Sequence, residues 1–83
     1  LAQNFPNPFN PSTVIRFALP KGGEVDLSVY DASGRLVAHL VHGRMRGGAH
    51  ALTWTPAGAA SGIYFYLLRA QGVTIARKAV LLR

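Results

Sequence analysis

Hydrophobic and polar residues alternate strictly in two neighbouring segments, residues 13–19 and residues 24–30. The positions on the apolar face are Thr13, Ile15, Phe17 and Leu19 in the first segment and Val25, Leu27 and Val29 in the second. A period of two is the pattern of a β-strand that buries one face. The intervening residues 20–23, Pro-Lys-Gly-Gly, have the composition of a turn. We therefore predict that the two strands form a hairpin.

Four further strands are predicted after a second turn at residues 31–34. The apolar spacing in residues 35–41 fits either a helical turn or a bulged strand. The shortness of this segment and its strand neighbours favour the strand. The other three predicted strands are residues 50–54, 63–69 and 73–82.

The run at residues 63–69 is the most apolar of the chain, which predicts a central strand covered on both faces. Its predicted inward positions are Tyr64, Tyr66 and Leu68. Trp54 shares one face of its strand with His50 and Leu52, so it is expected in the core. Residues 42–48 are expected to be a flexible, basic loop.

These elements predict one all-β domain over residues 1–83, a small antiparallel immunoglobulin-like β-sandwich of about six to seven strands. A small closed barrel is the alternative arrangement. The only methionine is Met45 and the first residue is Leu1, so we expect this domain to be excised from a larger multidomain secreted protein.

A proline-rich segment, residues 4–13, precedes the first strand. Its prolines fix their own φ and lack an N–H, which excludes a helix or a central strand. The segment also contains Phe5 and Phe9, two large apolar residues among polar ones. We interpret it as a rigid lead-in anchored by both rings, and a simple proline-rich linker is the alternative.

The composition, 49% hydrophobic and 14% charged, predicts a packed core rather than disorder. The net charge of +6 raises the question of nucleic acid or an acidic surface as partner. The basic residues are spread over several strands, and only Arg44 and Arg46 cluster, so nucleic acid is not expected. The chain contains no apolar run of 18 residues, so no transmembrane helix is predicted.

Candidate chemistry is sparse. With three histidines and three acidic residues, no nucleophile motif is present and no catalysis is expected. His39 lies in a predicted strand and His42 in a predicted loop, so we expect solvated histidines, no metal site and no cofactor. Carbohydrate binding needs an exposed platform of aromatic rings, for which Tyr30 and Phe65 are the candidates.

Three motifs occur in order along the whole chain. They are Gln-Asn-Phe-Pro-Asn-Pro-Phe-Asn-Pro-Ser-Thr at residues 3–13, Val-Tyr-Asp-Ala-Ser-Gly-Arg at 29–35, and Ser-Gly-Ile-Tyr-Phe-Tyr at 61–66 followed by Arg77-Lys78 and an apolar end. Together they resemble the C-terminal sorting domain of type IX secretion system cargo. They are also similar to the immunoglobulin-like domain of flagellar hook-capping proteins.

The resemblance implies a non-catalytic sorting signal, whose partners are the outer-membrane secretion machinery and the rest of the parent chain. The parent, for example a secreted hydrolase, would pass through the periplasm and be secreted or held at the cell surface, where a polysaccharide is a further candidate partner. The residues that match the family motifs are Asn7, Pro8, Phe9, Asn10, Pro11, Gly34, Gly62, Tyr64 and Lys78. The alternative function is a carbohydrate-binding or adhesive module of an extracellular enzyme. We also predict that residues 73–82 form an edge strand within the recognised surface.

Overall fold

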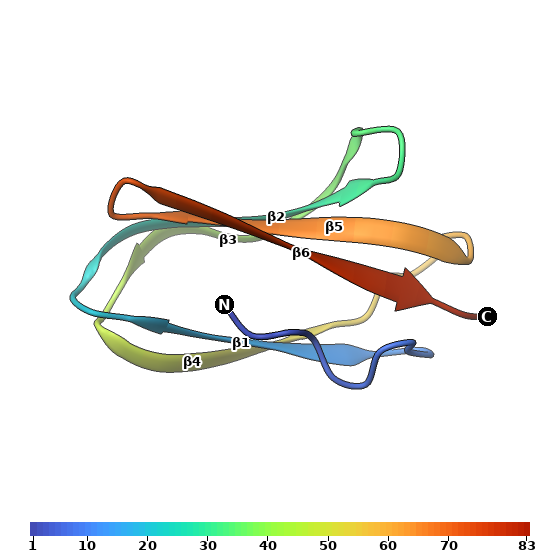
Figure 1. The fold of residues 1–83 in the computed structure, drawn as a ribbon, viewed down its shortest axis with the longest axis horizontal. Helices are drawn as coiled ribbons and strands as arrows, with labels where there is room; N and C mark the ends of the chain where they lie inside the picture. Colours follow the sequence, from blue (N-terminus) through green and yellow to red (C-terminus); the bar gives the residue numbers. More distant parts are fainter.

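The computed structural model describes all residues, Leu1–Arg83, as a sandwich of two antiparallel sheets without helices (Figure 1). One sheet pairs β1 (Thr13–Leu19) with β4 (Gly48–Trp54). The other has the order β3 (Leu36–Met45), β2 (Gly23–Asp31), β5 (Gly62–Ala70) and β6 (Val73–Leu81). The predicted all-β immunoglobulin-like class is confirmed, and β6 lies at a sheet edge as predicted.

The predicted hairpin between the first two strands is wrong. β1 pairs along its whole length with β4, from Thr13 opposite Trp54 to Leu19 opposite Gly48. β2 instead pairs with β3 and β5 in the facing sheet. Each of the two strands has a single apolar face, and both faces are buried when the strands lie in opposed sheets. The turn predicted at residues 31–34 is confirmed, and β2 and β3 form an antiparallel hairpin on either side of it.

The core lies between the sheets, and the predicted inward faces of β1, β2 and β5 are confirmed. Its buried apolar residues are Phe9, Ile15, Phe17, Leu19, Val25, Leu27, Val29, Trp54, Tyr64, Tyr66, Leu68, Ala79 and Leu81. Trp54 is the centre of an aromatic cluster. Its ring centroid lies 5.4 Å from that of Phe9 and 5.6 Å from that of Tyr64, the latter in an edge-to-face arrangement.

β5 is central in its sheet but is not covered on both faces, which corrects the prediction. The side chains of Ile63 and Phe65 point to the outer face, where Phe65 remains 38% exposed. No layer of the sandwich packs on this face (Figure 1). The unbroken apolar run at residues 63–69 is therefore compatible with two kinds of strand, one buried on both faces and one whose outer face is apolar but exposed.

Residues 42–48 are not a flexible loop. β3 continues to Met45 and β4 begins at Gly48, so Arg46 and Gly47 alone join them. A side chain at position 47 would place its Cβ 3.0 Å from the Cα of Lys21, so the tight turn favours a residue without a Cβ here. The strand is prolonged because β2 pairs with it as far as Gly23 opposite Met45.

The bulge predicted in the third strand is confirmed. Between Leu27 and Ser28 the register of β2 with β3 shifts, so that Asp26 lies opposite His42 and Ser28 lies opposite His39. Residues three apart in a regular strand face opposite sides, but one extra residue brings both histidines to the outer face. The expectation that the two histidines stay apart is therefore wrong. Ser28 also points to this outer face and is buried beneath the two histidines.

The proline-rich segment joins both sheets, and the linker alternative is ruled out. Phe5 pairs with Val14 of β1 through hydrogen bonds of 3.0 and 2.9 Å. Phe9 then pairs with Leu81 in parallel, through bonds to the Val80 carbonyl and from the Leu82 amide. Only Phe9 is an anchor. Phe5 is 73% exposed, because it lies opposite Val14, which points away from the core.

Candidate functional site

The three sequence motifs meet at one end of the sandwich, the right-hand end in Figure 1. This end, here called the motif end, consists of residues 7–11, the turn 31–35, the loop 55–62 and residues 81–83. The Arg83 side chain donates to the carbonyl of Ala59 at 2.6 Å and to that of Pro56 at 2.5 Å. A shallow pocket is lined by both the turn 31–35 and residues 58–64. Segments far apart in the chain thus form one continuous surface.

The opening motif is tied to the end of β6. Asn7 Oδ1 accepts a hydrogen bond of 2.9 Å from the backbone N–H of Val80, and Phe9 is 2% exposed. The remaining motif residues of this segment, Pro8, Asn10 and Pro11, are exposed. The segment therefore combines one buried anchor with a polar outer surface of fixed shape.

Gly34 closes the hairpin between β2 and β3. Its φ of +90° lies in the region that favours glycine, and its N–H donates to the Asp31 carbonyl at 3.0 Å. The Asp31 carboxylate accepts hydrogen bonds from the hydroxyl and amide of Ser33 and from the amide of Arg35. The bond from the Ser33 hydroxyl, followed by that from the Arg35 amide, lowers the pKa of Asp31.

Replacement of Asp31 by alanine is expected to lower the melting temperature at neutral pH, because the turn loses its acceptor. Because the pKa of Asp31 is lowered by folding, its ionised carboxylate stabilises the fold at pH values above the pKa of the unfolded state, about 3.9. This stabilisation is lost as the pH falls through the pKa of the folded state. The difference between wild type and variant should therefore shrink below about pH 4. Melting curves between acidic and neutral pH measure this. Glu24→Ala is the control, since no hydrogen bond or ion pair involves the Glu24 side chain; an equal loss there would contradict the role of the turn.

Gly62 and Tyr64 hold the loop 55–62 to the motif end. Gly62 opens β5 with a φ of +155°. The buried Tyr64 side chain donates from its hydroxyl to the Ala60 carbonyl at 2.6 Å. Lys78 is the one motif residue away from this end. It lies midway along β6 opposite Phe65, with an exposed side chain, and its carbonyl accepts from Gln3 Nε2 at 2.6 Å.

A buried polar network beneath the opening motif was missed by the sequence reasoning. The N–H of Asn4 donates to the Tyr66 hydroxyl at 2.7 Å, and that hydroxyl donates to the Ala2 carbonyl at 2.8 Å. The Asn4 side chain donates to Thr13 Oγ1 at 2.9 Å. The available signal was a polar residue, Thr13, at an inward-facing position of an otherwise apolar strand.

The aromatic residues considered for carbohydrate binding divide between the core and the outer face of the larger sheet. Trp54 is buried, as predicted. Tyr30 and Phe65 lie opposite each other on the outer face of β2 and β5, where Phe65 is 38% exposed. The polysaccharide partner therefore stays a prediction.

Comparison with known proteins gives one match. A family model described as the secretion system C-terminal sorting domain matches residues 3–82. No curated protein and no solved structure matches the chain. The fold contains no helix of the length and hydrophobicity needed to span a membrane. Because the match covers nearly every residue, including all three motifs, the chain belongs to the secretion system C-terminal sorting domain family, that of the type IX system.

Proposed function

We propose that this domain is a non-catalytic signal that the type IX outer-membrane export machinery reads in its folded form, directing the parent protein through the periplasm to the cell surface or the medium. The observation that carries the proposal is the motif end. Asn7 and Phe9 bind the end of β6, so motifs from both ends of the chain form one surface only after folding. A receptor that recognises this surface would select folded domains.

We further propose that the first half of β6 is the sheet edge to which a strand of that machinery binds. Residues 7–9 cover the edge of β6 from Val80 onward. Backbone groups alternate in direction along a strand, so Thr74 and Ala76 present theirs to the open edge. Of these two residues, only Ala76 has a partner for an edge-facing group: its carbonyl accepts from the Arg77 side chain at 3.1 Å. Open strand edges accept partner strands through such groups.

An apolar groove adjoins this open edge. It is lined mainly by Leu19 and Pro20 at the end of β1 and by Leu68, Val73 and Ile75 of the other sheet. A strand added beside β6 would place alternate side chains into this groove. Arg77 and Lys78 follow directly along β6, so an acidic segment would gain favourable charge interactions.

The test is export of a reporter. Residues 1–83 are fused behind a periplasm-directed fluorescent protein in a host with a type IX system, and fluorescence outside the cell is measured. Ala76→Pro removes one edge-facing N–H, and Ala51→Pro removes its counterpart on the free edge of β4. We expect export of the wild type and of Ala51→Pro, and retention of Ala76→Pro in a folded state, as judged by the melting curve of the purified domain.

The outcomes separate the two parts of the proposal. Retention of the wild-type fusion in the periplasm would refute the sorting function itself. Export of Ala76→Pro at the wild-type level would refute the edge of β6 as the binding site for a partner strand, but it would not contradict the sorting function.

A further inference from the structure

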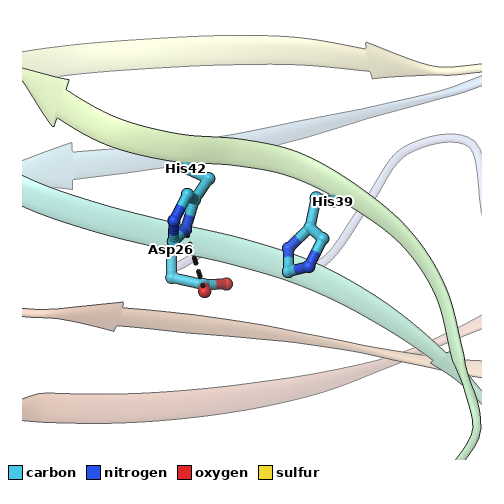
Figure 2. Close-up of side chains that lie close together, drawn as sticks. All are labelled: Asp26, His39 and His42. Carbon is cyan, nitrogen blue, oxygen red and sulfur yellow. Dashed lines mark ion pairs between the residues drawn. The ribbon is translucent and has the colours of Figure 1, made fainter.

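Three side chains of the types that ligate metals lie together on the outer face of the four-stranded sheet. Asp26 of β2 lies beside His39 and His42 of β3, as Figure 2 shows. One potential ligand atom from each residue lies within 4.8 Å of those from the other two. The His42 Nδ1 is 3.5 Å from Asp26 Oδ2, and the two imidazole centroids are 5.7 Å apart. This cluster lies on β2 and β3, outside the motif end.

Ser28, which is fully buried, orients two of these groups from below. Its hydroxyl donates to Asp26 Oδ1 and lies 3.0 Å from His39 Nδ1. A hydroxyl has one proton, and here the carboxylate accepts it, so His39 Nδ1 must be the donor to Ser28. The neutral His39 ring then has its lone pair on Nε2. This pattern, in which one ring nitrogen donates to a neighbour and the other is available, is that of metal-binding histidines.

We propose that Asp26, His39 and His42 form a binding site for a divalent transition-metal ion of the zinc type. Two imidazole nitrogens and one carboxylate oxygen suit zinc and its first-row neighbours rather than magnesium or calcium, which prefer oxygen ligands alone. The three protein ligands leave a fourth position for water.

The geometry requires only small movements. Tetrahedral zinc with bonds of 2.0–2.1 Å places ligand atoms about 3.3 Å apart. The Asp26 and His42 atoms already approach this separation. Both histidine side chains are exposed, so the His39 ring is free to turn and bring Nε2 toward the other two ligand atoms. Arg69 lies opposite Asp26 on β5 but forms no ion pair with it within 4.0 Å, so the carboxylate is free to bind a cation.

The test is a calorimetric titration of the tag-free, chelator-treated domain with Zn²⁺, repeated with Co²⁺ as an optical probe. We expect saturable binding of one ion per chain. In the NMR spectrum of the unmodified protein, the imidazole signals of His39 and His42 should shift while that of His50 does not. His50 lies in the other sheet, with Nε2 2.8 Å from the Arg46 carbonyl and its ring stacked on Phe17.

Substitutions complete the test. Asp26→Asn, His39→Gln and His42→Gln should each weaken Zn²⁺ binding at least about tenfold, and His50→Gln should leave it unchanged. Absence of saturable binding would overturn the site. So would an equal loss in His50→Gln, or displacement of Zn²⁺ by Mg²⁺ at similar concentration.

Discussion

Replacement of Phe9 by alanine is expected to lower the free energy of unfolding by about 3–5 kcal/mol. The Phe9 ring is 2% exposed and packs against Trp54, so its removal leaves a cavity beside the largest core residue. Its backbone also pairs with β6, so the cavity would open where the two ends of the chain meet. A domain of this size has a total stability of about 5–15 kcal/mol, so the loss is a large share. Urea denaturation followed by Trp54 fluorescence measures it.

The chain provides a matched control in Phe5→Ala. Phe5 belongs to the same motif but is 73% exposed, so its truncation should change stability by less than about 0.5 kcal/mol. Equal losses for the two variants would contradict the assignment of Phe9 as the sole anchor. The same pair separates structure from recognition. If Phe5→Ala keeps its stability and loses export, Phe5 is part of the recognised surface.

Replacement of Tyr66 by phenylalanine is expected to cost about 1–3 kcal/mol, although the ring remains in place. Its hydroxyl accepts the hydrogen bond from the Asn4 N–H, which would be left buried without an acceptor. The Ala2 carbonyl also loses its donor, but Ala2 is exposed and water can replace it. Chemical denaturation of both proteins at neutral pH measures the difference.

Tyr30→Phe is the control, because the Tyr30 hydroxyl forms no hydrogen bond within the protein and its removal should be nearly neutral. Burial raises the pKa of Tyr66. The Tyr66 hydroxyl therefore holds its proton more strongly in the folded state than in the unfolded state. The stabilisation by the protonated hydroxyl is present below the pKa of the unfolded state, about 10, and is lost as the pH rises through the pKa of the folded state. The alkaline fall in stability should be shallower in Tyr66→Phe than in wild type. Identical alkaline profiles would contradict the buried hydroxyl.

Local pattern predicted most of the strands and the direction of their side chains. The alternation at residues 13–19 and 24–30 identified β1 and β2 and their buried faces, and Tyr64, Tyr66 and Trp54 were correctly placed in the core. A period of two reports directly on which side of a strand is apolar, so these features need no knowledge of the partner strand. The three motifs likewise indicated the family from the chain alone.

The local pattern does not reveal which segments lie side by side in the fold. Alternation does not tell which strand pairs with which, so β1 was assigned to β2 when its partner is β4, far along the chain. It also could not separate Phe5 from Phe9, whose burial depends on the strands that each one pairs with.

The candidate metal site depended most on tertiary information. In a regular strand, a spacing of three residues would place His39 and His42 on opposite faces. The bulge opposite Ser28 places both on the same face as Asp26. Most strands, their apolar faces and the family follow from residues that are close together in the chain. The pairing of strands, the register within each pair and the open outer face of the larger sheet arise from long-range packing, because they depend on residues that are distant in the chain and adjacent only in the fold.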